Sequence, residues 1–186
     1  MRVIGISGWS GSGKTTLITK VIPRLLARGL TVSTLKHAHH GFDVDQPGKD
    51  SHTHRTAGAT EVLIGSAKRW ALMHELRDAP EPSLYDLLQK LSPVDLVVVE
   101  GFKTALHAKV EVYRHEVGKP PFHPDNPHVV GIVSDTPFPK AERPVVDIND
   151  IDAVVDLLVE RSEPIDKVLA RSGVPQDRIY ARSLLR

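Results

Sequence analysis

Residues 8–15 form a glycine-rich segment whose residue types and spacing suit the binding of phosphate groups. The segment reads Gly-Trp-Ser-Gly-Ser-Gly-Lys-Thr and matches the pattern G-x-x-x-x-G-K-[ST] at every position. Glycines let the backbone curl so that successive N–H groups point at phosphate oxygens, and a following helix adds the partial positive charge of its N-terminus. Lys14 is then expected to bridge the β- and γ-phosphates of a nucleoside triphosphate. The residues expected to contact the phosphates are Gly8, Ser10, Gly11, Ser12, Gly13, Lys14, Thr15 and Thr16.

The Thr15 hydroxyl is expected to ligate Mg²⁺, and a magnesium site needs a further carboxylate nearby. Glu100 follows the apolar run 96–99, the strongest signal for a buried strand in the chain. Because ligands of parallel sheets gather at the carboxyl ends of strands, we expect Thr15 and Glu100 to bind the metal and, with Lys14, to carry any catalysis. The alternative for Glu100 is a surface charge at a strand end. Gly101 is expected to approach a γ-phosphate through its backbone N–H.

The identity of the base does not follow from these motifs, because the chain lacks the Asn-Lys-x-Asp sequence that reads guanine in GTPases. Asp135 follows the expected strand 130–133, about where such a carboxylate would reach a base. The alternative is that residues 134–137, Ser-Asp-Thr-Pro, form only a turn.

Five of the ten histidines fall between residues 37 and 54, among acidic and basic side chains. Imidazoles and carboxylates suit zinc or nickel, but the spacing shows no helical pair such as H-E-x-x-H, and neighbouring cations disfavour a dication. Recognition of a phosphate or another anion through Lys49 and Arg55 is the second possibility, and a solvated loop is the third. Asp45 could also support the magnesium through a water.

The elements that must position these residues follow from the apolar patterns. Strands are expected at 3–6, 30–35, 61–65, 69–73, 96–100, 109–113, 129–133 and 144–147. Helices are expected at about 14–28, kinked at Pro23, at 83–91 and at 151–159, with long loops at 37–56 and 119–127. This alternation predicts an α/β fold of three layers, with a mainly parallel sheet covered by helices and a β-hairpin extension.

Composition excludes several classes of protein. The 186 residues include 24 basic and 23 acidic side chains, which gives a net charge of +1. No overall electrostatic field therefore favours binding to nucleic acid or to a membrane surface. No cysteine is present, which excludes disulfides and thiolate metal sites and fits a cytoplasmic protein. No apolar run approaches the length of a membrane span.

Several motifs together resemble the MobB family of molybdopterin-guanine dinucleotide biosynthesis adaptor proteins. They are GWSGSGKTT at 8–16, LKHAHH at 35–40, DVDQPGKDS at 43–51, RTAGA at 55–59, RWALM at 69–73 and VEGFK at 99–103. The resemblance implies a P-loop nucleotide-binding domain over residues 1–161. Residues 162–186 lie outside it and are expected to form a C-terminal helical extension, the alternative being a solvated and partly frayed tail.

The resemblance also implies a function: a GTP-binding homodimer, at most a weak GTPase, that assists the guanylyltransferase attaching GMP to molybdopterin. Mg²⁺ and molybdopterin are the further ligands that it implies, and molybdoenzyme maturation proteins are further partners. Strand 109–113 is a candidate edge for pairing across the dimer. The resemblance assigns ligand contacts to Lys36, His37, His40, Asp45, Lys49, Asp50, Arg55 and Lys103.

Two other functions are compatible with the sequence. One is a P-loop kinase that phosphorylates a small molecule, for which His37 and Arg55 could serve as base and lid arginine. The other is a metallochaperone GTPase that loads nickel or zinc through the histidine-rich loop.

Overall fold

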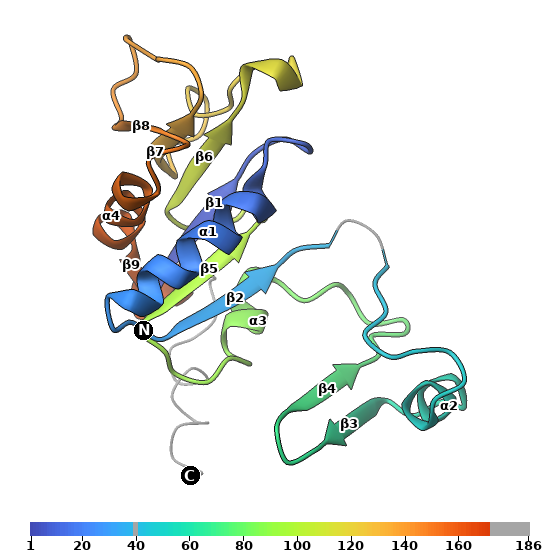
Figure 1. Cartoon of the computed structure of the whole chain (residues 1–186). Helices are drawn as coiled ribbons and strands as arrows, with labels where there is room; N and C mark the ends of the chain where they lie inside the picture. Colours follow the sequence, from blue (N-terminus) through green and yellow to red (C-terminus); the bar gives the residue numbers. More distant parts are fainter. Residues whose placement is uncertain (39–40, 172–186) are drawn as a thin grey trace. The chain divides into compact units, whose positions relative to one another are not determined.

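The computed structural model describes residues 1–38 and 41–171, which form two compact units (Figure 1). The sheet unit comprises Met1–His37 and Leu84–Arg186, and the hairpin unit comprises Ala38–Ser83. Most of the predicted phosphate and metal residues belong to the sheet unit. The predicted contacts Asp45, Lys49, Asp50 and Arg55 belong to the hairpin unit.

The sheet unit is built on a mainly parallel sheet with strand order β2-β5-β1-β6-β7-β8. Strand β1 (Arg2–Ser7) is central and runs parallel to both of its neighbours, β5 and β6. A short strand, β9, pairs antiparallel with the start of β1. The other strands are β2 (Val32–Lys36), β5 (Leu96–Glu100), β6 (Lys109–Tyr113), β7 (Val129–Ser134), β8 (Val145–Asp147) and β9 (Glu163–Pro164).

Helices cover both faces of this sheet, because successive side chains of the central strands point to opposite faces. Ile4 and Val98 pack in one apolar cluster with α1 (Lys14–Ala27) and α4 (Ile151–Arg161). Val3 and Val97 pack in a second cluster with α3 (Leu84–Leu88) and α5 (Ile165–Ala170). Each fully buried side chain of this size contributes about 1.5–3 kcal/mol of transfer free energy. The predicted three-layer α/β fold is confirmed.

The helix after the phosphate loop is set by its apolar spacing. Leu17, Ile18, Val21 and Leu25 are its buried residues and fall on one face at helical intervals. The helix passes through Pro23 without ending and stops just before Gly29, whose positive φ of 80° closes it.

The hairpin unit contains β3 (Glu61–Gly65), β4 (Trp70–His74) and α2 (Asp50–Thr56). The antiparallel pairing of β3 and β4 confirms the predicted hairpin. The prediction of a loop over the whole of 37–56 is wrong for α2. This helix has no buried residue, so it leaves no apolar period in the sequence, and its acidic first turn and basic last turn suit the helix dipole.

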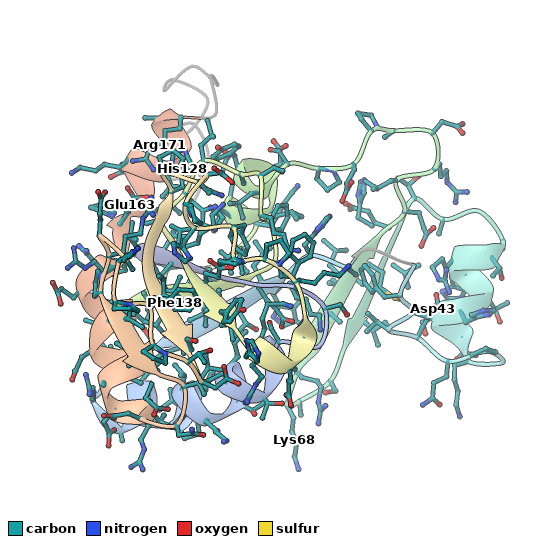
Figure 2. The ribbon with its side chains drawn as sticks, turned by 90° about the horizontal axis from the view of Figure 1, so that it is seen from above. Asp43, Lys68, His128, Phe138, Glu163 and Arg171 are labelled. Atoms are coloured by element: carbon teal, nitrogen blue, oxygen red, sulfur yellow. The ribbon has the colours of Figure 1, made fainter. Side chains whose placement is uncertain are left out.

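Strand β6 is internal, which corrects its prediction as an edge strand. It lies between β1 and β7, and its polar residues Lys109 and Glu111 are fully buried. The described part of the expected extension also joins the sheet unit, through β9 and α5. Glu163 accepts from the Ala108 N–H and forms an ion pair of 2.7 Å with Arg171. Figure 2 labels Glu163, Arg171 and the nearby His128.

No helix in the described ranges has the length and apolar character needed to cross a bilayer.

Candidate nucleotide-binding site

The phosphate loop, residues 8–15, joins β1 to α1 at the carboxyl edge of the central strand. Gly11 and Gly13 have positive φ values of 82° and 85°, a conformation that other residues rarely adopt. Gly13 caps the helix, and its carbonyl accepts the Leu17 N–H at 2.9 Å. The first N–H groups of α1 have no partner within the helix, which is the arrangement that binds anions.

Lys14 lies folded against the loop that it follows. Its Nζ donates to the carbonyl oxygens of Gly8 at 3.1 Å and Trp9 at 2.9 Å. Burial lowers the pKa of Lys14; the Glu100 carboxylate opposes this shift, while the ammonium groups of Lys103 and Lys36 add to it. Several ammonium groups in mutual repulsion around one loop favour the binding of a polyanion.

Thr15 and Glu100 meet as the sequence predicts. Strand β5 runs parallel to β1 with Glu100 opposite Ile6, and the Thr15 hydroxyl donates to Glu100 Oε1 at 2.9 Å. Lys36, at the end of β2, lies 3.5 Å from the same carboxylate oxygen. A hydroxyl and a carboxylate oxygen are ligands that Mg²⁺ accepts, so these two residues fit such an ion.

The segment after Glu100 turns sharply beside the phosphate loop. Gly101 has a φ of 92°, and its N–H, which the sequence suggests for a γ-phosphate, donates to Ile6 O at 3.1 Å. Lys103 Nζ lies 4.1 Å from the centre of the Trp9 ring, and burial lowers its pKa while Glu111 opposes that shift.

His37 lies next to the same segment. Its N–H donates to Glu100 O at 2.9 Å, and its ring is centred 4.6 Å from that of Phe102. A Cβ atom at Gly101 would come within 3.1 Å of His37, so the close approach requires glycine. His40, a further predicted contact, lies outside the described residues.

Asp135 lies beyond the carboxyl end of β7, as predicted. Burial acts to raise its pKa, but the His115 N–H, the Thr136 hydroxyl and Arg114 outweigh burial, and the net shift is downward. Asp135 also lines a cavity of about 460 Å³, together with Ser134, Thr136, Pro137, Phe138, Pro139, Val145, Val146 and Asp147.

In the hairpin unit, Arg55 and Asp45 bind each other. Arg55 donates to both carboxylate oxygens of Asp45, at 3.0 and 2.9 Å, and also to Asp43 at 2.9 Å. Glu75 lies 3.6 Å from the same guanidinium. A hydrogen bond from Arg55 is the main cause of the lowered pKa of Asp45. The guanidinium therefore holds carboxylates of its own unit.

Lys49 and Asp50 lie elsewhere in that unit, at a cavity of about 620 Å³. The cavity is bounded by the start of α2 and by β3. Its lining comprises Gly48, Lys49, Asp50, Ser51, His54, Val62, Leu63, Ile64 and Gly65.

Two groups that shape the site are not among the residues predicted from the sequence. Trp9 Nε1 donates to Pro120 O at 2.8 Å, which ties the phosphate loop to the proline-rich segment. Lys109 Nζ donates to the carbonyl oxygens of Phe102, Lys103 and Ala105 at 3.1, 2.8 and 2.6 Å, and burial lowers its pKa to about 8. No local signal marks Lys109, because its burial depends on the position of β6 within the sheet.

The histidine-rich segment gives no metal cluster in the part of the chain that the structure covers. Across residues 1–38 and 41–171, no group of three or more His, Cys, Asp or Glu side chains could hold a metal ion.

The parallel sheet and the glycine-rich loop between β1 and α1 are those of an α/β protein of the P-loop NTPase type. A family model described as molybdopterin guanine dinucleotide synthesis protein B, MobB, matches residues 3–135. The chain therefore belongs to the MobB family.

Individual relatives agree with this assignment. The chain is 42% identical over 161 residues to the molybdopterin-guanine dinucleotide biosynthesis adapter protein of Escherichia coli (strain K12), covering 85% of this chain and 91% of that protein. It is 40% identical over 159 residues to the protein of that name from Haemophilus influenzae, covering 84% and 86%. A crystal structure of molybdopterin-guanine biosynthesis protein B matches with a TM-score of 0.65 and 25% identity, covering 85% of this chain and 98% of that one.

Proposed function

We propose that this protein is a GTP-binding adapter in the biosynthesis of molybdopterin guanine dinucleotide. The observation that carries the nucleotide part is the meeting of the Thr15 hydroxyl and the Glu100 carboxylate, 2.9 Å apart, directly beside the phosphate loop. The adapter part rests on family membership and on the names of the relatives. The proposed setting is the cytoplasm.

The proposed binding mode follows the sheet order. The N–H groups of the phosphate loop and Lys14 would bind the phosphates, and Thr15 with Glu100 would hold Mg²⁺ at the γ-phosphate end. When bound, the metal would neutralise charge on the phosphates. The nucleoside would extend past the end of β6 toward the cavity beside Asp135, which lies between the end of β7 and β8.

The proposed partner is the guanylyltransferase that converts molybdopterin to its guanine dinucleotide, followed by molybdoenzyme maturation proteins. Slow hydrolysis suits this role, because an adapter acts through its bound state. Molybdopterin itself carries a phosphate and a flat ring system. The cavity of the hairpin unit offers Lys49, Ser51 and His54 opposite the apolar side chains of β3, which is a suitable lining for such a ligand.

The proposed homodimer involves the hairpin unit. Leu63, Leu72 and Trp70 share one face of the hairpin and are 68%, 49% and 70% exposed, while α2 packs against β3. An exposed apolar face on a two-stranded sheet with unpaired edges favours association with a second copy. Sedimentation of the protein should give a dimer, and Leu72→Lys should give a monomer; a dimer that survives this change would exclude this face.

The function is tested by calorimetric titration of GTP and of ATP, each with and without Mg²⁺. Preference for GTP, with tighter binding in Mg²⁺, is expected. Preference for ATP would contradict the proposed guanine nucleotide and favour the kinase interpretation. Binding of the guanylyltransferase is tested separately by sedimentation of the mixed proteins, since the adapter role predicts a complex.

A further inference from the structure

Arg114 lies on the opposite side of the phosphate loop from the metal residues. It directly follows β6, and β6 and β5 flank β1 on its two sides. Glu100 ends β5, so Glu100 and Arg114 approach the loop from opposite edges of the central strand. The phosphate loop is therefore bordered by a carboxylate on one side and by a guanidinium on the other.

The guanidinium lies directly against the start of α1. A Cβ atom at Gly13 would come within 3.3 Å of Arg114 Nε and 3.7 Å of its Nη2. A cation at a helix N-terminus meets the positive end of the helix dipole, which is unfavourable unless an anion lies close to both. Within the described residues, the guanidinium donates no hydrogen bond, and the hydroxyl of buried Ser12 in the same loop also lacks a partner.

Asp135 lies next to this guanidinium. One of its oxygens accepts from the His115 N–H at 3.1 Å and from the Thr136 hydroxyl at 3.0 Å. Its other oxygen lies 3.9 Å from Arg114 Nη1, an ion-pair distance that is too long for a hydrogen bond. The carboxylate therefore attracts the Arg114 guanidinium without accepting a hydrogen bond from it, so the guanidinium donors are available to a phosphate.

We propose that Arg114 binds the phosphate chain of the nucleotide on its nucleoside side, and that Asp135 positions it there. The inference rests on the proposed nucleotide binding. It adds Arg114 as a further contact and says on which side of the phosphate loop the nucleoside lies. Because the metal residues Thr15 and Glu100 border the γ-phosphate end, Arg114 contacts phosphates that GTP and GDP share. Its contribution is then independent of the metal.

Titration of GTP and GDP into Arg114→Ala tests this assignment. Loss of a charge-assisted contact should weaken both nucleotides by a similar factor, about tenfold or more, with and without Mg²⁺. Arg114→Lys should recover only part of the affinity, because an ammonium lacks the planar fork of the guanidinium. Arg24→Ala, an exposed change on α1, serves as the matched control, and thermal melting of each variant checks the fold.

Three outcomes would overturn the proposal. Unchanged affinity in Arg114→Ala, with binding lost in Lys14→Ala, would remove Arg114 from the site and leave the proposed function standing. Loss of GTP affinity alone, with GDP unaffected, would indicate that Arg114 contacts the γ-phosphate instead of the phosphates that the two nucleotides share. Absence of guanine-nucleotide binding in the unaltered protein would reject the proposed nucleotide function and this inference with it.

The role of Asp135 is tested by a double-variant cycle. Asp135→Asn should weaken GTP and GDP together and less than Arg114→Ala does, and the double variant should bind like Arg114→Ala alone. Losses that add, or a changed preference between GTP and ATP in the Arg114→Ala background, would assign Asp135 its own contact with the base. Either result would overturn its role as a positioning residue.

Discussion

Lys14 and Arg55 are both cations that the sequence predicts as contacts for an anionic ligand, and the structure surrounds them differently. Lys14 donates to two backbone carbonyl oxygens of its own loop, and its pKa is lowered chiefly by burial, with the ammonium groups of Lys103 and Lys36 adding to the shift. Arg55 donates to two carboxylates and lies 3.6 Å from a third. Lys14 donates only to neutral carbonyls and is partly compensated by nearby Glu100, whereas the charge of Arg55 is compensated within the hairpin unit by carboxylates that accept its hydrogen bonds.

This difference separates a cation that could bind an added anion from one whose charge is already paired within its own unit. A bound anion gains most where positive charge is uncompensated, and it must displace existing partners where charge is already paired. Sequence proximity to a phosphate-binding motif is therefore a weaker guide to ligand contact than the partners that a side chain already has.

The largest effect is expected from Lys14→Ala. The change removes the charge that the phosphate loop directs at the nucleotide, so GTP affinity should fall at least about a hundredfold while the fold is kept. Calorimetric titration measures this loss, and Lys20→Ala, an exposed lysine on the same helix, is the matched control. Equal affinities for the two variants would place the nucleotide elsewhere.

Glu100→Gln should have a smaller and conditional effect. Loss of the carboxylate should weaken GTP binding about tenfold in Mg²⁺ and leave binding without Mg²⁺ nearly unchanged. The comparison requires titrations in Mg²⁺ and in a chelator, with Glu160→Gln, an exposed change on α4, as control. Equal losses under both conditions would remove Glu100 from the metal site.

Arg55→Ala should affect stability and leave GTP affinity intact. Removing the guanidinium leaves Asp45 buried beside unpaired carboxylates, so the midpoint of thermal unfolding should fall by about 5 °C. Hydrogen exchange should show faster exchange in the hairpin unit, with the exposed Arg69→Ala as control. A loss of GTP affinity without loss of stability would contradict this account and indicate that Arg55 contacts the ligand.

The smallest effect is expected from pH. The pKa of Asp45 is lowered in the folded chain, chiefly by Arg55, so its ion pair stabilises the hairpin unit above about pH 4 and is lost as pH falls through the folded pKa. Asp45→Asn should flatten this acid dependence of stability, and exposed Asp78→Asn should not. Parallel acid unfolding of Asp45→Asn and the unaltered protein would contradict the ion-pair account.

The glycine-rich loop, the approach of Glu100 to Thr15 and most strands could be predicted from the sequence because their signals are local. A glycine pattern defines the backbone shape of the loop. An apolar run such as 96–99 defines a buried strand, and Glu100, which directly follows this run, then lies at the carboxyl edge of the sheet. Pairing in parallel register then brings Glu100 to Thr15, because both follow adjacent strands.

Helix α2 and the buried charges of β6 could not be predicted in this way. The helix buries no side chain, so no apolar period marks it. The alternation of Lys109, Val110 and Glu111 is typical of a strand with one solvated face, yet both charged residues are fully buried. Their burial depends on neighbours distant in sequence: Lys109 binds the carbonyl oxygens after β5, and Glu111 accepts from His123 in the proline-rich segment.

The sequence by itself determined the glycine-rich loop, the α/β fold class and the family, since each depends on residue types at fixed local spacing. Only the tertiary structure decided which cations already donate to carboxylates, because this depends on which side chains the fold brings together. The fold places the Arg55 guanidinium against carboxylates of the hairpin unit. It also brings Arg114, one hundred residues from Lys14 in the chain, to the start of α1, the helix that begins with Lys14. For Arg114 the physical reason is the strand order of the sheet, which places the end of β6 beside the loop that follows β1. For Arg55 it is the packing of α2 in the hairpin unit, where Asp43 and Asp45 accept from the guanidinium.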